Sequence, residues 1–165
     1  MTTARIAPAT PADVPVLLAL IRALADYEKL SGSVVVTEAA IRESLFGPQK
    51  AAEAIIARAG DEPVGFALWF HNYSTFLGRR GLYLEDLFVK PEWRGRGVGR
   101  QLLAEVAAVA VARNCGRMEW SVLDWNEPAI RTYRSIGAAP MDEWTVYRLT
   151  GDALRALAAK ASMTP

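Results

Sequence analysis

The sequence contains one cysteine and one histidine in 165 residues. The single cysteine, Cys115, excludes an intrachain disulfide, and we expect a reducing, cytoplasmic environment. One histidine and one cysteine are too few for an ordinary zinc site, so we expect no metal. Any catalysis must therefore depend on carboxylates, tyrosines and backbone groups.

Long hydrophobic runs and a strong charge of one sign are also missing. The apolar runs are much shorter than the ~18 residues that cross a bilayer, and residues 1–6 lack the hydrophobic region of a signal peptide. The formal net charge is +1, so we expect neither nucleic acid nor a membrane as partner. The basic residues gather at Arg79–Arg80 and Arg94–Arg100, and such short clusters suit a small anionic ligand.

The chain has enough apolar residues for one well-filled core, because 52% of its residues are hydrophobic. No repeat, low-complexity tract or long linker divides it. We therefore expect one domain over residues 1–165, with a core at about residues 4–150.

Apolar periodicity and turn residues predict the order of the elements. Helices are expected after Thr10, Thr37, the glycine loop ending at Arg100 and Asn126, with a terminal helix at about residues 152–160, and residues 71–81 are expected to form a loop. The expected strands are residues 5–9, 52–58, 64–70, 82–89, 117–123 and 144–150. Hairpins in the first half and strand–helix–strand crossovers in the second predict an α/β (α+β mixed) fold, in which helices flank a mixed sheet.

The most informative stretch begins with the predicted strand Leu82–Val89, which carries Glu85 and Asp86 in its middle. Arg94-Gly95-Arg96-Gly97-Val98-Gly99-Arg100 follows and leads into an apolar-periodic helix. Glycines allow a close approach of the backbone, and the amides at a helix start point at a bound anion. This stretch predicts a site for a phosphorylated ligand.

Two familiar phosphate-binding motifs do not fit these glycines. A P-loop requires Gly-Lys-Ser/Thr, which is absent. The dinucleotide motif requires a third glycine where Arg100 stands, and no unbroken alternation of strands and helices precedes the loop.

The remaining pattern, Arg94-x-x-Gly97-x-Gly99 between a strand and a helix, resembles the pyrophosphate-binding motif of the GNAT superfamily of N-acetyltransferases. Residues 24–30 (LADYEKL), 82–89 (LYLEDLFV) and 125–138 (WNEPAI to Gly137-Ala138) are similar to the diamine (spermidine/spermine) acetyltransferases. Residues 73–76 and 78–79 are closer to the thialysine-acetylating branch of that family. The similarity covers nearly the whole chain, with the blocks in order.

The resemblance implies a GNAT fold, with a mostly antiparallel sheet and splayed strands that bind acetyl-CoA. Backbone groups of the strand end are implied to pair with the pantetheine arm, and the glycine loop is implied to wrap the pyrophosphate. The implied cofactor-binding residues are Leu87, Phe88, Val89, Arg94, Gly95, Arg96, Gly97, Val98, Gly99, Arg100, Asn126, Pro128, Ala129 and Tyr133.

The resemblance also implies the catalytic residues. A carboxylate in an apolar strand costs on the order of 2–7 kcal/mol if it is buried without partners. Glu85 is therefore expected to be solvated, paired with a cation or functional. An attacking amine must lose a proton, and Glu85 is implied to accept it, directly or through water, or to hold the ammonium. Strand alternation predicts Glu85 and Asp86 on opposite faces. Tyr133 is implied to protonate the departing thiolate.

Tyr27 and Glu28 are implied to contact the amine, and we expect the same of Asp86, Glu119, Trp120 and Ser121. Residues 30–34 carry no acid where polyamine acetylators have carboxylates, and Ser74 replaces an aspartate of that branch. A smaller substrate than a polyamine is therefore expected, such as thialysine or a short diamine. Acetylation of protein lysines or N-termini and a non-catalytic CoA-binding module are the alternatives. The resemblance also implies a homodimer, to which residues 144–149 could contribute.

Overall fold

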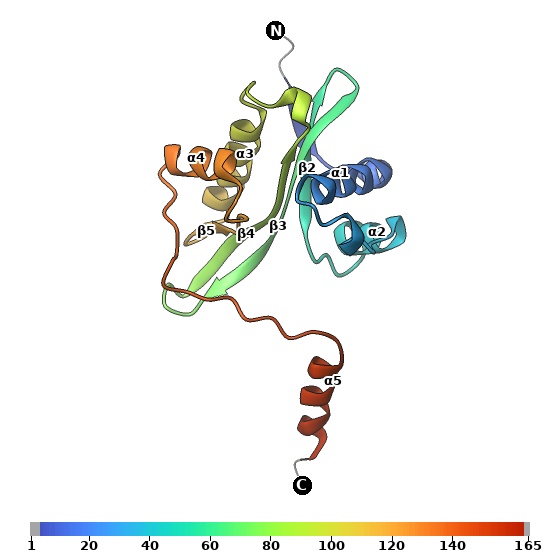
Figure 1. Cartoon of the computed structure of the whole chain (residues 1–165), viewed down its shortest axis with the longest axis vertical. Helices are drawn as coiled ribbons and strands as arrows, with labels where there is room; N and C mark the ends of the chain where they lie inside the picture. Colours follow the sequence, from blue (N-terminus) through green and yellow to red (C-terminus); the bar gives the residue numbers. More distant parts are fainter. Residues whose placement is uncertain (1–3, 164–165) are drawn as a thin grey trace. The chain divides into compact units, whose positions relative to one another are not determined.

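A computed structural model describes residues 4–163 of the chain (Figure 1). It contains two compact units, one ending at Glu127 and the other beginning at Pro128. The elements of the first unit are β1 (Arg5–Pro8), α1 (Val14–Tyr27), α2 (Glu38–Phe46), β2 (Glu53–Ala59), β3 (Glu62–Ser74), β4 (Arg79–Val89), α3 (Val98–Ala112) and β5 (Met118–Trp120). The helices of the rest of the chain are α4 (Glu127–Ser135) and α5 (Gly151–Ala159).

The sheet has five strands in the order β1-β2-β3-β4-β5. The strands β1 to β4 pair antiparallel with their neighbours, and β5 pairs parallel with β4. The predicted mixed, mostly antiparallel sheet flanked by helices is therefore confirmed.

The strand β4 is irregular at Glu85. Leu68 of β3 is opposite Asp86, whereas the next residue, Trp69, is opposite Leu84, so Glu85 is the extra residue of a β-bulge. The pairing of β4 with β5 runs only from Leu82 to Leu84. Beyond this point, β4 is paired only with β3, because β5 ends at Trp120 and its strand pairing does not extend along the other edge of β4.

One face of the sheet packs against α1 and α2. A short 3-10 helix, Pro11–Asp13, leads directly into α1 and begins with a capping box, in which the backbone N–H and the hydroxyl of Thr10 both donate to Asp13 Oδ2 at 2.8 Å. The Thr37 hydroxyl accepts from Ala40 N–H at the start of α2, as predicted. The buried residues of this core are Val14, Leu17, Leu18, Leu20, Ile41, Leu45, Ala54, Ile56, Phe66 and Phe88.

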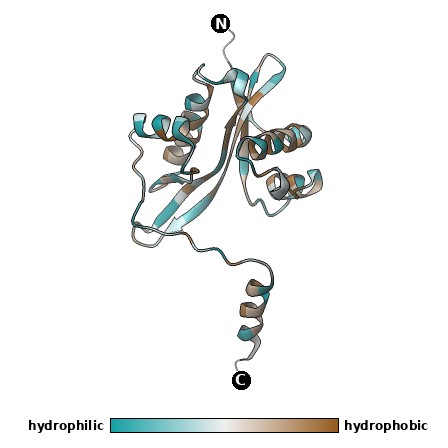
Figure 2. Ribbon diagram, in the orientation of Figure 1, coloured by the Kyte–Doolittle hydropathy of each residue, from teal (hydrophilic) through white to brown (hydrophobic). Residues whose placement is uncertain are grey.

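The opposite face packs against α3. Leu102, Leu103, Val106 and Ala110 are buried along this helix, and hydrophobic residues also gather along the middle of the strands (Figure 2). Gly65 permits close packing here, because an added Cβ would lie 2.6 Å from the Phe88 carbonyl oxygen and 3.4 Å from Leu102 Cδ1.

Three predicted elements differ from the structure. The predicted loop 71–81 is wrong over most of its length, because β3 continues to Ser74 and β4 begins at Arg79. The predicted strand 117–123 is shortened to Met118–Trp120. The strand predicted at 144–150 is absent from the described residues: this segment is irregular and Trp144, Val146 and Tyr147 are exposed. A strand needs a partner for its backbone groups. The predicted terminal helix is confirmed as α5.

Within residues 4–163, we find no helix with the length and apolar character needed to cross a bilayer.

Candidate active site

The glycine loop leads directly into α3. Gly95 and Gly97 have φ values of 74° and 83°, which side chains rarely tolerate, and Gly97 is the N-cap of α3. A Cβ added to either glycine would meet no heavy atom within 4 Å, so both face open space. Gly99, in the first turn, lies close to β4, since its added Cβ would be 3.6 Å from Val89 Cγ2. Val98 anchors the helix start in the core. Because the first amides of a helix have no partner within the helix, this turn is a candidate cradle for an anion.

The end of β4 offers backbone groups to the same region. Lys90 N–H donates to Val64 O across to β3, and backbone groups alternate along a strand between its two edges. The groups of Leu87 and Val89 therefore face the edge that β5 has left. Those of Phe88 face β3, and its side chain is buried in the core. Of the three residues expected to pair with the pantetheine arm, two have their backbone on the open edge.

Arg94 is fixed against the strand end. Its Nε donates to Val89 O at 2.9 Å, and its guanidinium carbon lies 4.0 Å from the centroid of the Tyr27 ring and 5.8 Å from that of Phe88. Arg96 stacks on Trp93, with 4.6 Å to the ring centroid. Arg100 is exposed on α3. The loop therefore carries guanidinium groups beside its open amides.

Three carboxyl groups, those of Glu28, Glu85 and Asp86, lie close together just after the pairing of β4 with β5 ends. Glu85 is exposed in the bulge, whereas Asp86 is mostly buried. Burial, with the nearby charges of Glu85 and Glu28, raises the pKa of Asp86 to about 6. Burial also raises the pKa of Glu28, at the end of α1. The prediction of opposite faces for Glu85 and Asp86 assumed regular alternation, which the bulge interrupts.

The residues in β5 and directly after it that were expected to contact the substrate interact with other parts of the protein. Glu119 accepts from Arg117 Nε at 2.9 Å and from Asn72 Nδ2 at 3.1 Å. Ser121 Oγ lies 2.8 Å from the Tyr83 hydroxyl. Trp120, opposite Leu84, ends the pairing with β4 and is half-buried. The side chains of Glu119 and Ser121 therefore connect this segment to β3 and β4.

Tyr27 lies between Arg94 and the segment that precedes α4. Its hydroxyl donates to Asn126 Oδ1 at 3.1 Å, and its ring lies 5.8 Å from that of Trp125. Lys29, in the left-handed region at φ 62°, places its ammonium 5.2 Å from the Trp125 ring. The predicted substrate residue Tyr27 therefore contacts two predicted cofactor-binding residues.

Three predicted residues lie on α4, after the boundary between the two units: Pro128, Ala129 and Tyr133. Tyr133 is half-buried, and its carbonyl oxygen accepts from Ile136 N–H and Ala138 N–H at the end of the helix. Gly137 follows in the left-handed region, as its φ of 86° shows.

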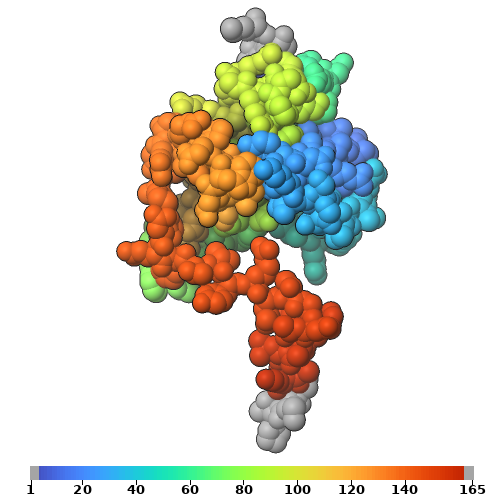
Figure 3. Space-filling view, in the orientation of Figure 1, coloured from blue at the N-terminus to red at the C-terminus, as the bar shows by residue number. Residues whose placement is uncertain are grey.

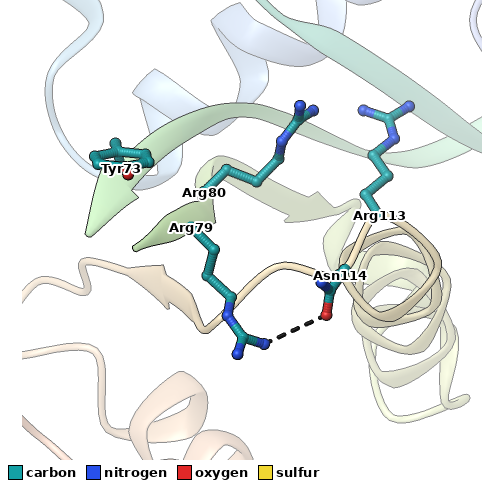
Figure 4. Close-up of a pocket in the computed structure, with 5 residues that line it drawn as sticks. All are labelled: Tyr73, Arg79, Arg80, Arg113 and Asn114. Atoms are coloured by element: carbon teal, nitrogen blue, oxygen red, sulfur yellow. Dashed lines mark hydrogen bonds between the residues drawn. The ribbon is translucent and has the colours of Figure 1, made fainter. Parts of the chain in front are cut away.

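A separate basic cavity of about 480 Å³ is lined by Tyr73, Arg79, Arg80, Arg113 and Asn114 (Figure 4). It lies at the C-terminal end of α3, and a helix of 15 residues places it ~20 Å from the glycine loop. Arg79 donates to Asn114 and points away from the other two arginines. Arg113 is held by Glu53 and His71. The arginines do not converge on one point.

No three His, Cys, Asp or Glu side chains of residues 4–163 are grouped closely enough to hold a metal ion. Cys115 Sγ lies 3.8 Å from His71 Nδ1, but this nitrogen is also 2.9 Å from Gly81 O, in a different region from the glycine loop.

Two aromatic residues beside the predicted ones, Tyr83 and Trp125, were not predicted to belong to the site. Tyr83 lies two residues before Glu85, and its ring packs against Phe70 at 5.2 Å. Trp125 precedes Asn126 directly. Their closeness in sequence to predicted residues was the available signal, but their partners are distant in the chain.

These features are those of an acetyltransferase, and comparison with known proteins agrees. The model of the acetyltransferase (GNAT) family matches residues 21–138, so the chain belongs to this family and is an N-acetyltransferase. GNAT acetyltransferases use acetyl-CoA, and the open glycine cradle fits a pyrophosphate.

Two curated relatives and one solved structure illustrate the match. The chain is 41% identical over 155 residues to the thialysine N-epsilon-acetyltransferase of Bos taurus, covering 87% of this chain and 91% of the relative. It is 33% identical over 198 residues to the L-ornithine N5-acetyltransferase of Arabidopsis thaliana, covering 93% and 87%. An integron cassette protein from the mobile metagenome of V. cholerae superposes with a TM-score of 0.79 at 28% identity, covering 96% of this chain and 98% of that one.

Proposed function

We propose that the protein transfers an acetyl group from acetyl-CoA to the side-chain amine of a small amino acid such as thialysine or ornithine, or to a short diamine. The observation that carries this proposal is the open edge of β4, which begins beside three carboxylates and ends at the glycine loop. The curated relatives named for thialysine and ornithine support the substrate class.

The absence of further acids supports a small amine over a polyamine. Ser74, which stands where the polyamine branch has an aspartate, is buried, and its hydroxyl accepts from Leu77 N–H in the hairpin turn. The cluster of Glu28, Glu85 and Asp86 supplies negative charge for the ammonium group of a small amine. A polyamine would leave further ammonium groups with fewer acidic partners.

The residues that would hold acetyl-CoA are those of the strand end, the loop and the first turn of α3. The backbone groups of Leu87 and Val89 would pair with the pantetheine arm, and the amides of residues 95–100 would bind the pyrophosphate. The cofactor supplies an activated acetyl thioester. The family resemblance is the basis for proposing that Asn126, Pro128, Ala129 and Tyr133 also bind the cofactor.

The carboxylates would bind the substrate ammonium and accept its proton. Glu85, exposed in the bulge, is the proposed base or ammonium anchor, acting directly or through water. Asp86 is a second candidate base, since a carboxyl group with a pKa of about 6 accepts a proton near neutral pH more readily than an ordinary one. Glu28 would add to the attraction for the ammonium.

Tyr133 is the proposed acid, because its phenol can donate a proton to a thiolate leaving group.

The decisive experiment measures CoA release with thialysine, ornithine, short diamines, spermidine and a lysine peptide. Turnover of the amino acids or diamines in preference to spermidine and the peptide supports the proposal, and release with the peptide alone overturns it. Tyr133→Phe should lower kcat by about 10²-fold or more, which is the usual contribution of a general acid, with acetyl-CoA affinity unchanged. Unchanged kcat removes Tyr133 from the mechanism.

We further propose that the protein is a cytoplasmic homodimer whose interface includes residues 144–149. Trp144, Val146 and Tyr147 are 73%, 84% and 93% exposed, and a contiguous apolar segment of this kind is typical of an interaction surface. The single free cysteine supports a reducing compartment. Light scattering should give twice the chain mass, and Trp144→Ser with Tyr147→Ser should shift it toward the monomer. A monomer at all concentrations contradicts the dimer.

A further inference from the structure

A continuous stack of side chains connects three segments that are distant in the sequence. It runs from Lys29 to Trp125, from Trp125 to Tyr27 and from Tyr27 to Arg94, with separations of 5.2, 5.8 and 4.0 Å. In Figure 3 the blue surface at the end of α1 borders the yellow-green surface of the loop that follows β4. The stack therefore joins the end of α1, the cofactor loop and the segment before α4.

Within this stack, Arg94 is held at two points. The Nε–H donates to Val89 O, and the guanidinium carbon lies over the Tyr27 ring, 4.0 Å from its centroid. A cation over an aromatic face is attracted by the ring quadrupole. Both terminal nitrogens of Arg94 make no hydrogen bond with the described residues, so they remain available to a phosphate while the group is held in one orientation.

Tyr27 uses its polar group on the other side of the stack. Its hydroxyl donates to Asn126 Oδ1 at 3.1 Å, so the amide nitrogen of Asn126 must point elsewhere. One tyrosine thus orients both an arginine of the loop and an amide of the segment that follows β5. Its hydroxyl and one ring face are already occupied by protein groups.

We infer that Tyr27 is a positioning residue for acetyl-CoA binding, and not a direct contact of the amine. This inference rests on the proposed function, since it assigns Arg94 and Asn126 to the acetyl-CoA site. Glu28, the next residue, belongs to the acidic cluster. The end of α1 therefore contributes to both substrate sites through adjacent residues.

The test separates acetyl-CoA affinity from amine affinity in Tyr27 variants of the full chain. Calorimetric titration with CoA and acetyl-CoA requires no turnover, so it remains informative if every amine in the panel fails. Tyr27→Leu removes the ring and the hydroxyl and should weaken CoA binding about tenfold, with the KM of thialysine or ornithine at saturating acetyl-CoA changed less than about twofold. Tyr27→Phe keeps the ring and should restore most of the CoA affinity.

Two further variants serve as controls. Tyr73→Leu alters a tyrosine that is 63% exposed near the β3–β4 hairpin and should leave CoA affinity unchanged. Glu28→Gln should raise the amine KM without weakening CoA binding. If Tyr27→Leu raises the amine KM and leaves CoA affinity unchanged, Tyr27 is a substrate contact and the inference is overturned.

Arg94→Lys keeps the inference testable if Tyr27→Leu does not fold. Lysine retains the positive charge but loses the planar group that lies on Tyr27 and reaches Val89 O. The loss of CoA affinity should equal that of Tyr27→Leu, and a double variant should lose no more than either single variant if both residues act as one unit. Full CoA affinity in Arg94→Lys contradicts positioning through the stack.

Discussion

Asp86 lies opposite Leu68 of β3, on the face of the sheet that packs against α1 and α2. A carboxyl group in this position has little water around it and two other carboxylates nearby, so its pKa rises from 3.8 to about 6. The raised pKa makes the folded state less stable at neutral pH. It also lets the Asp86 carboxylate accept a proton near neutral pH, as a catalytic base must.

We predict that Asp86→Asn stabilises the protein above pH 6. Because the folded pKa is higher than the unfolded pKa, ionisation opposes folding, and the difference amounts to about 3 kcal/mol at neutral pH. The gain should be largest at about pH 7.5 and fall to about a third at pH 4.5, where most of the folded-state carboxyl is protonated. Urea unfolding at both pH values measures it. Asp61→Asn, in the exposed turn before β3, is the matched control. An equal effect of Asp86→Asn at both pH values would contradict the raised pKa.

The same carboxyl group should appear in the pH dependence of catalysis. If Asp86 accepts the proton, kcat/KM for the amine falls as the pH drops through about 6, and this bend is lost in Asp86→Asn. Steady-state rates over a pH series at saturating acetyl-CoA measure the bend. Retention of the bend in Asp86→Asn with its loss in Glu85→Gln would assign the base to Glu85 alone.

Gly97→Ala should weaken acetyl-CoA binding more than it destabilises the fold. The φ of 83° costs an alanine on the order of 1 kcal/mol, and the new methyl group enters the open space of the cradle. Gly60→Ala is the matched control, because Gly60 also has a positive φ, of 60°, and open space around it, but lies in the turn between β2 and β3. Thermal unfolding should be lowered similarly in both variants, and calorimetry should detect weaker CoA binding only in Gly97→Ala. Equal CoA affinities would show that the cradle does not face the cofactor.

Leu102→Ala should destabilise the protein by about 2–5 kcal/mol, because the side chain is fully buried between α3 and the sheet. Val111→Ala, on the same helix but 80% exposed, should cost less than about 0.5 kcal/mol. Denaturant unfolding measures both changes. A small effect of Leu102→Ala would mean that α3 does not depend on this contact for its position on the sheet.

The parts of the fold that could be predicted from sequence depend on local signals. Thr37 and the apolar spacing of α3 specify helices through contacts within a few residues, although α3 begins at Val98, inside the segment that was predicted as the loop. The residues of the β3–β4 hairpin were predicted as a loop because His71 and Tyr73 are polar or aromatic. Their strand conformation comes from pairing with Leu82 and Arg80, which no local pattern encodes.

The candidate site was likewise predictable where its signals are local and not where they depend on tertiary contacts. The glycine loop and the two carboxylates were visible as a motif, but the bulge that changes their relative orientation depends on the register with β3. The contacts of Tyr27 with Arg94 and Asn126 join residues 67 and 99 positions apart in the sequence. Such contacts are properties of the tertiary structure, and sequence alone predicted only that each residue belongs to the site.

The bulge at Glu85 makes β4 sensitive to its length as well as to its composition. Deletion of Glu85 would remove the extra residue and restore regular pairing, with Leu84 still opposite Trp69 and Asp86 still opposite Leu68. Insertion of one residue after Asp86 would instead shift every later residue of β4 by one position, so that the backbone groups of Leu87 and Val89 would face β3 and the ring of Phe88 would leave the core. Loop residues 75–78 at the hairpin tip have no such constraint. Single-residue insertions should therefore be tolerated at the tip and abolish activity between Asp86 and Val89, whereas deletion of Glu85 should preserve the fold and remove only the carboxylate.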